Sequence, residues 1–348
     1  MGKISVVVPC HNVSEYLDKC VEYLLHQTIG IENMEIILVD DASTDDGATQ
    51  SLIMEYERQF PETVMAVFLE ENLRQGGARN VGVSYAGGEY LIFCDADDWM
   101  LEETLEHCYH AAKKYDADVV EFKRINVGIR DMHIDLKCGD DSHLTELDTE
   151  EKRKAYLLDL KTGDYGSQNK LYRLSMIRDN QIVFPEHFIF EEVSFALPVR
   201  MYARRHYFLD EQLYVYYVSP GSTIRGDWGR EHRWDNLRIW ILLTGELEQR
   251  GLFSAYRQEI EYLFLRLGVG YMLAMLFVNY VLTKDEWKFL VETIQRLFPD
   301  IRENKYLQDN SSMENRVWNQ MLLGWLNMEF TDESVQAANR LMAECTRS

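Results

Sequence analysis

The chain is short of positive charge. Its 348 residues include 36 lysines and arginines against 58 aspartates and glutamates, which gives a formal net charge of -22. A field of this sign repels nucleic acid and anionic membrane surfaces, so we expect no nucleic-acid partner. An acidic chain that binds a phosphate-rich ligand needs local cations or a metal ion to do so.

Paired cysteines and long apolar runs are also missing. None of the 6 cysteines forms a C-x-x-C pair, so we expect free, buried thiols in a reducing cytoplasm. The uncharged stretch 267–283 is shorter than the ~20 residues that a membrane span needs. It favours a buried helix, with peripheral membrane contact as the open alternative. Residues 1–5 lead directly into a strand-like run, which predicts no signal peptide.

What the first half does contain is a regular alternation of two periodicities. Strands are expected at 4–9, 35–39, 64–69, 90–93 and 118–122, and helices at 14–27, 44–59, 76–85 and 101–115. Strands that alternate with helices predict a mostly parallel α/β sheet covered on both faces. Ligands of such sheets bind beyond the carboxyl ends of the strands.

The second half changes character. Two further strands are expected at 170–172 and 207–217, and long helical periodicity follows at 231–250, 255–282, 285–297 and 311–343. We therefore predict a catalytic or binding domain of residues 1–225 and an α-helical region of residues 226–348. The helical region predicts a bundle, a homodimer interface or a simple packing extension.

The most informative segment is Phe93-Cys94-Asp95-Ala96-Asp97-Asp98-Trp99, directly after an expected strand. It brings three carboxylates to one spot, where like charges repel each other. A bound counter-ion relieves this repulsion, and hard oxygen ligands suit Mg²⁺ or Mn²⁺. An ion in this place could hold a diphosphate. The alternative is a solvated, aspartate-rich turn.

Seven segments in this order resemble the motifs of the family 2 glycosyltransferases. Val6–Asn12 is similar to VSVIVPxYN, Glu35–Asp45 to EIIxVDDGSTD, Gln75–Gly82 to xGxxxARNxGI, Phe93–Trp99 to FLDSDDW, Asn169–Arg173 to NKLYR, Phe184–Phe195 to FPEGxxxEDxxF, and Tyr214–Ile224 to YYYRxRxxSxT. The matches extend over residues 3–225. The helical region carries no motif of the family.

This resemblance implies a GT-A fold, an α/β nucleotide-binding (Rossmann-like) mixed sheet, here with a C-terminal helical region. It implies inverting, metal-dependent transfer of a sugar from a nucleotide-diphosphate donor, usually a UDP-sugar, to an acceptor hydroxyl. The cofactor would be Mn²⁺ or Mg²⁺, and the acceptor a saccharide, a lipid-linked glycan or a protein. The usual setting is cell-surface polysaccharide or glycan synthesis, in the cytoplasm or at the inner face of the membrane.

The resemblance also assigns the donor side of the site. It makes Asp97 the direct metal ligand, and Asp95 a second ligand or a contact to ribose or to metal-bound water. Asp98 would support either, or cap the next helix. Arg79 would reach ribose or phosphate, or be a solvated surface cation. The complete set expected to bind the donor is Pro9, His11, Asn12, Asp40, Asp41, Ser43, Gln75, Arg79, Asp95 and Ala96.

The general base is assigned less uniquely. The family has Asp where this chain has Glu192, so Glu192 or the preceding Glu191 would accept the proton. The alternative is a glutamate pair that only favours a helix start. Glu192 for Asp, and Val218 for the family's arginine, leave open a non-catalytic sugar-nucleotide-binding scaffold. A phosphohydrolase is disfavoured, because its loop needs Thr or Val two residues after the second aspartate, and Trp99 and Met100 occupy that region here.

Overall fold

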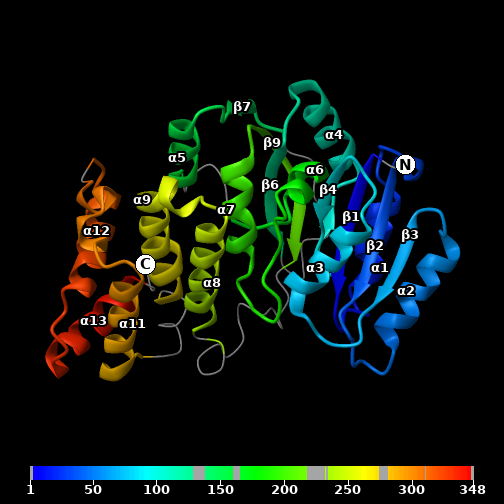
Figure 1. Ribbon diagram of the computed structural model, residues 1–348. Helices are drawn as coiled ribbons and strands as arrows, with labels where there is room; N and C mark the ends of the chain where they lie inside the picture. Colours follow the sequence, from blue (N-terminus) through cyan, green and yellow to red (C-terminus); the bar gives the residue numbers. More distant parts are fainter. Residues whose placement is uncertain are drawn as a thin grey trace. The chain divides into compact units, whose positions relative to one another are not determined.

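The structure, a computed structural model, describes residues 3–127, 138–159, 165–217, 232, 234–273, 281–309 and 311–345. The chain divides into two compact units, Met1–Ser222 (unit 1) and Thr223–Ser348 (unit 2), and Figure 1 labels most of their helices and strands. The domain boundary expected after residue 225 falls in 218–231, outside the described residues, and stays a prediction.

Unit 1 is built on one mixed sheet with the strand order β3-β2-β1-β4-β8-β6-β9-β5, and β7 pairs with β9. The strands are β1 (Ile4–Cys10), β2 (Met34–Asp40), β3 (Val64–Phe68), β4 (Tyr90–Phe93), β5 (Trp99–Met100), β6 (Val119–Val127), β7 (His143–Glu146), β8 (Lys170–Arg173) and β9 (Arg205–Tyr217). Strands β1 to β4 are parallel, as predicted, whereas β8 is antiparallel to β4 and β6. The carboxyl ends of β1, β2 and β4 therefore share one edge.

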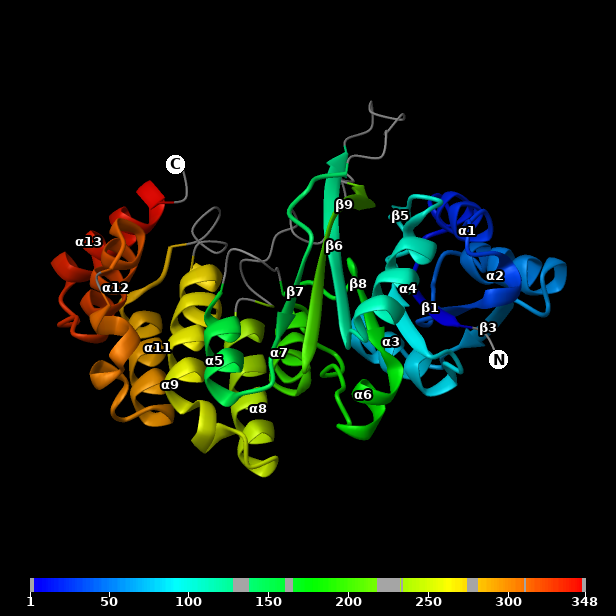
Figure 2. The same cartoon turned by 90° about the horizontal axis from the view of Figure 1, so that it is seen from above.

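Helices cover both faces of this sheet, as Figure 2 shows. They are α1 (Leu17–Leu25), α2 (Ala48–Gln59), α3 (Arg74–Tyr85), α4 (Thr104–Tyr115), α5 (Glu150–Leu158), α6 (Leu174–Asp179) and α7 (Glu192–Tyr202), with a 3₁₀ turn η1 (Ile31–Asn33). Alternate strand residues pack on opposite faces. Val6 and Val8 lie in the core formed with α1, α2 and α4. Val7 and Phe93 lie in the core formed with α3, α6 and α7.

Unit 2 is helical, as predicted. Its elements are α8 (Asp235–Gln249), α9 (Phe253–Leu263), the π-helix η3 (Phe264–Tyr271), α11 (Lys284–Leu297), η4 (Ile301–Glu303), η5 (Lys305–Gln308), α12 (Met313–Leu326) and α13 (Asp332–Cys345). The single periodicity expected over 311–343 is wrong, because two helices occupy it. Thr331 and Ser334 exchange backbone-to-side-chain hydrogen bonds of 3.1 Å and start a new helix there.

The uncharged stretch 267–283 lies partly outside the described residues, which omit 274–280. Its described residues Val269, Met272 and Leu273 are buried. Within the part of the chain that the structure describes, no helix is long and apolar enough to cross a membrane.

Candidate functional site

Two of the expected loops meet beyond the carboxyl ends of β1 and β2. The backbone N–H of Asn12 donates to Ser43 Oγ (3.0 Å), and the N–H of Thr44 donates to Asn12 Oδ1 (2.7 Å). The His11 ring donates through Nδ1 to the carbonyl of Asp41 (2.8 Å). His11 and Asn12 are exposed. The two loops thus form one bonded rim with polar groups facing outward.

The two aspartates at the end of β2 are buried within this rim. Asp40 accepts from Gln50 Nε2 (2.8 Å), and Asp41 accepts from the backbone N–H of Leu73 (2.7 Å). Burial raises the pKa of Asp41. Asp41 thereby connects the rim to the segment that opens α3.

The remaining donor residues expected from the sequence lie in different environments. Pro9 is buried within β1, Ala96 is buried, and Gln75 is exposed in the first turn of α3. Their contact with a donor stays a prediction.

Left-handed backbone surrounds the site. Six residues other than glycine have positive φ in its loops, namely Asn12 (55°), Ala42 (53°), Asp46 (54°), Arg74 (65°), His187 (65°) and Phe190 (68°). Each costs on the order of 1 kcal/mol or more in an L-residue, asparagine least. Such strain gathers where the surrounding structure dictates the shape of a site.

Arg79 provides a counter-charge from within the chain. Its guanidinium donates from Nη2 to Asp95 Oδ1 and from Nη1 to Glu191 Oε1, each at 2.7 Å. Arg79 is 0% exposed, so the alternative of a solvated surface cation is wrong. Its partners in the structure are carboxylates, and contact with ribose or phosphate stays a prediction. The chain itself therefore supplies a cation that offsets the charge of Asp95.

Asp95 and Asp98 are held by protein donors. Gln168 Nε2 donates to Asp95 Oδ2 (2.8 Å). Asp98 accepts from the Tyr214 hydroxyl (2.7 Å) and from the backbone N–H of Tyr217 (2.8 Å). Burial, followed by the nearby Asp95 charge, raises the pKa of Asp98 well above its ordinary value. The helix-cap alternative for Asp98 is wrong, because the residue capping α4 is Glu103.

Asp97 is different. It is partly exposed, and among the described residues only its own backbone N–H donates to its carboxylate. Burial and then the Asp95 charge raise the pKa of Asp97 to about 6. Its oxygens are therefore free to accept an added ligand.

The donor set fits a divalent cation that is shared with a phosphate-bearing ligand. In the described part of the chain, no group of three or more His, Cys, Asp or Glu side chains is placed to hold a metal ion by itself. Mg²⁺ needs only one or two carboxylates when substrate phosphates and water complete its shell. Asp97 can supply one, and Asp95 is its acidic neighbour.

Glu191 and Glu192 lie at the start of α7 and differ in their partners. Glu191 is bound by Arg79, whereas Glu192 accepts only from its own backbone N–H among the residues the structure describes. Burial and then Glu191 raise the pKa of Glu192 to about 8. Asp95, Asp97, Asp98, Glu191 and Glu192 are hereafter called the acidic cluster, and the Arg79 guanidinium binds two of its members, Asp95 and Glu191.

Sequence reasoning missed Gln168 and Tyr214, although both fix the aspartates. Gln168 directly precedes the NKLYR-like segment, and Tyr214 opens the last matched segment. Their positions beside or within these motif-like segments were the only indication in the sequence that the two residues belong to the site. What they contact depends on how β8 and β9 lie beside β4, which the motifs do not state.

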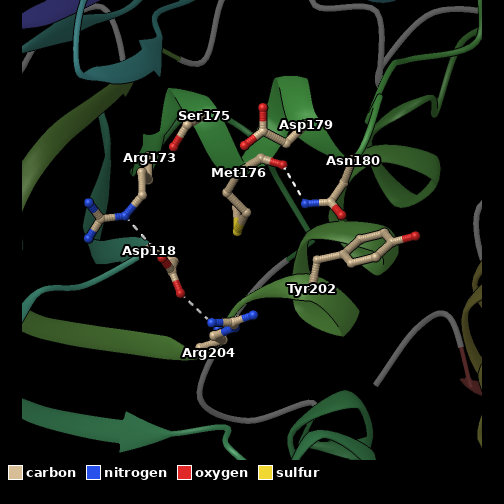
Figure 3. A pocket seen from close by; sticks show the side chains of 8 residues that line it. All are labelled: Asp118, Arg173, Ser175, Met176, Asp179, Asn180, Tyr202 and Arg204. Atoms are coloured by element: carbon tan, nitrogen blue, oxygen red, sulfur yellow. Dashed lines mark hydrogen bonds and ion pairs between the residues drawn. The ribbon is translucent and has the colours of Figure 1, made fainter.

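A separate cavity of about 300 Å³ is lined by Asp118, Arg173, Ser175, Met176, Asp179, Asn180, Tyr202 and Arg204 (Figure 3). Arg173 is paired with Tyr90, the first residue of β4, so the cavity lies at the opposite edge of the sheet from Asp95. None of the predicted site residues lines it.

Comparison with known proteins agrees with this fold. Residues 5–180, just over half of the chain, match the family model of glycosyl transferase family 2. Glycosyltransferase GlyG of Streptococcus pneumoniae is 31% identical over 74% of this chain and 89% of that relative. The poly(ribitol-phosphate) beta-glucosyltransferase of Bacillus spizizenii is 28% identical over 63% of this chain, which spans 34% of that relative.

Two solved structures are similar in fold. S. aureus TarS 1-349 in complex with UDP-GlcNAc has a TM-score of 0.69 and 21% identity, over 99% of this chain and 91% of that one. The mannosyltransferase PcManGT of Pyrobaculum calidifontis, in complex with GDP-Man and Mn²⁺, has a TM-score of 0.51 and 15% identity, over 97% and 87%. The fold is thus that of a GT-A glycosyltransferase. The chain belongs to glycosyl transferase family 2 and transfers a sugar.

Proposed function

We propose that the chain is an inverting, metal-dependent glycosyltransferase that moves a sugar from a UDP-sugar to a hydroxyl of a cell-surface glycan. The nucleotide is suggested by the UDP-GlcNAc bound to TarS. The acceptor class is suggested by the poly(ribitol-phosphate) transferases among the relatives. Polyol or saccharide hydroxyls of a wall polymer are the acceptors to test first.

The environment of Glu192 is the single observation that best supports this mechanism. Glu192 is a carboxyl group with no other side chain bonded to it in the described structure, and its pKa of about 8 lies near working pH. A general base is most effective when its pKa is close to the operating pH. Glu191 is a poorer base, because Arg79 binds its carboxylate at 2.7 Å.

In the proposed reaction the acceptor oxygen forms a bond to the anomeric carbon while the bond from that carbon to the diphosphate breaks. The acceptor proton passes to Glu192, and the electron pair of the broken bond leaves with the nucleoside diphosphate. Attack from the face opposite the leaving group inverts the anomeric centre, as in inverting glycosidases.

A divalent cation at Asp97 and the diphosphate would offset the negative charge of the leaving group. We assign Asp97 as its protein ligand, with Asp95 as the adjacent carboxylate already held by Arg79 and Gln168. For the nucleotide, Asp40 is proposed to accept from the base. The rim residues His11, Asn12, Asp41 and Ser43, with Pro9, Gln75 and Ala96, would form the remaining wall.

We assign catalysis to residues 1–225 and leave residues 226–348 without a catalytic role. Homodimerisation through this helical region is tested by light scattering of the full chain. Association with the inner face of the membrane, where lipid-linked acceptors would be used, is tested by vesicle sedimentation.

The deciding experiment is a donor screen over UDP-, GDP- and dTDP-sugars, with Mn²⁺ and with a chelator. Turnover of one UDP-sugar that the chelator abolishes supports the proposal, and NMR of the product reports whether the anomeric centre is inverted. Binding of UDP without turnover across wall-polymer acceptors would instead favour the scaffold.

A further inference from the structure

A buried arginine joins the two sides of the proposed site. Arg79 lies in the middle of α3, with no exposed surface. It binds Asp95, which follows β4, and Glu191, the N-cap residue of α7. These partners are 16 and 112 residues away in the chain. One guanidinium therefore fixes the distance between the donor side and the base side.

The packing around Arg79 leaves little freedom. A Cβ atom on Gly76 would come within 2.7 Å of the Pro185 carbonyl oxygen and 2.9 Å of Glu191 Cγ. Asn80 exchanges two hydrogen bonds of 2.9 Å with the backbone of Phe184. Helix α3 is thus bonded to the segment 184–191 at close range.

The same segment is strained, with His187 and Phe190 at positive φ just before Glu191. A strained backbone persists only when its surroundings dictate it. Contact with Arg79 is one such constraint, and Glu192 is the next residue along. An error of about 1 Å in the base can lower a rate by about 10²-fold.

Fold stability alone is a weak reason for this arrangement. A fully buried ion pair contributes little net stability compared with apolar residues of similar volume. Among the described residues, the buried Nε of Arg79 also has no hydrogen-bond partner, which adds a desolvation cost. The Arg79 guanidinium thus adds little stability but joins the carboxylates of Asp95 and Glu191. Its arrangement is better explained by the positioning of these two groups than by stabilisation of the fold.

We propose that Arg79 is a positioning residue, whose guanidinium holds Asp95 and Glu191 so that Glu192 is presented at a fixed distance from the leaving diphosphate. This inference rests on the proposed role of Glu192 as the base. Arg79 touches neither substrate nor the reacting atoms in this role.

The test compares Arg79→Lys, Glu191→Gln and Arg79→Met/Glu191→Met. Lysine keeps the charge without the two-pronged geometry, and the double variant removes both members of the pair, so it leaves no unpaired glutamate if the single variants fold poorly. The matched control is Arg200→Lys, because Arg200 is also buried in unit 1 but contacts the carbonyls of Tyr156 and Asp159. All are measured for melting temperature, UDP affinity with Mn²⁺, kcat, and kcat/KM against pH.

We expect Arg79→Lys and the double variant to remain folded, to bind UDP within about threefold of wild type, and to lose about 10²-fold in kcat. The charged groups that act on Glu192 are Glu191, Arg79 and Asp95. Because Glu191 raises the pKa of Glu192, Glu191→Gln should move the acid limb of kcat/KM to lower pH. Arg200→Lys should lower the melting temperature and leave that limb in place.

Wild-type kcat in Arg79→Lys and the double variant would overturn the inference. A fall in kcat that only follows the melting temperature, with the acid limb unmoved in Glu191→Gln, would also overturn it. Failure of the proposed function is separate, because Glu192→Gln would then keep full turnover whatever Arg79 does.

Discussion

Buried carboxylates occur in both units, but their partners differ. In unit 2, Asp235, Glu259 and Glu261 are each nearly inaccessible, and each has its own cation. The ion pairs are Asp235–Arg238 (3.1 Å), Glu259–Lys305 (3.4 Å) and Glu261–Arg257 (2.8 Å). In unit 1, the five groups of the acidic cluster have one bonded cation, Arg79, among the described residues.

The difference distinguishes buried carboxylates that stabilise the fold from carboxylates that are placed to bind a ligand or a proton. A paired buried carboxylate needs nothing further, because hydrogen bonds and charge satisfy it locally. A cluster with excess acid shifts its pKa values and favours an added cation or proton, which is the usual condition of an active site. Asp97 and Glu192 are its two members without another side chain bonded to them in the described structure.

The largest expected effect is that of Asp97→Ala. It removes the proposed metal ligand, and we expect turnover to fall by about 10⁴-fold, which corresponds to about 5 kcal/mol of transition-state stabilisation. Steady-state kinetics with the preferred donor measures it. The matched change in unit 2, Glu261→Gln, should lower the melting temperature and leave kcat within about threefold. Near-normal rates in Asp97→Ala would remove the metal assignment.

The next effect is that of Glu192→Gln, which keeps the size of the side chain and removes its basicity. We expect kcat to fall by about 10³-fold, within the usual range for a general base. UDP affinity, measured by calorimetry, should stay within about threefold. An amide that supports normal turnover would mean that Glu192 is not the base.

The pH dependence of kcat/KM in the wild-type protein is expected to be a smaller effect than those of the two substitutions, and its direction follows from the pKa of Glu192. With a pKa of about 8 in place of its ordinary 4.5, Glu192 is mostly protonated at pH 7 and cannot accept a proton. We expect kcat/KM, which reports the free enzyme, to rise about tenfold between pH 7 and pH 9. Glu192→Gln should lose this limb. A wild-type rate that is flat over the range would contradict the proposed role.

The smallest effect concerns stability in the two units. A Cβ on Gly82 would lie 2.3 Å from Val7 Cγ1, whereas one on Gly245 in α8 would meet nothing within 4 Å. Gly82→Ala should destabilise the protein by about 1–3 kcal/mol through overpacking. Gly245→Ala should stabilise it by about 0.5–1 kcal/mol through helix propensity. Thermal unfolding of both variants would show whether the sheet unit is the less tolerant of added volume.

Local patterns were enough to place the strand ends and loops of the proposed donor side. Strands β1, β2 and β4 end within one residue of their predicted ends. Each apolar run stops there because polar residues follow, namely Asn12, Asp41 and Asp95. The buried state of Arg79 could not be read in this way. Its helix spacing looks like a surface position until Glu191, far along the chain, is packed against it.

One prediction also failed because one long helix and two consecutive helices have the same apolar periodicity in the sequence. The break between α12 and α13 lies inside a continuous apolar periodicity, and only the paired bonds of Thr331 and Ser334 set the new start. Gln168 and Tyr214 were missed for a different reason. Their roles arise from strand neighbours, and a one-dimensional pattern does not contain the order of strands in the sheet.

The left-handed residues in the loops of the site have a consequence for how the stability of this chain could be improved. Glycine at Ala42 or His187 would relieve the local tension, so selection for heat resistance alone would favour it there. The same change would increase the conformational freedom of the loop, so the proposed donor site would be less rigid. We therefore expect the sequence with the highest thermal stability to differ from the sequence with the highest turnover rate.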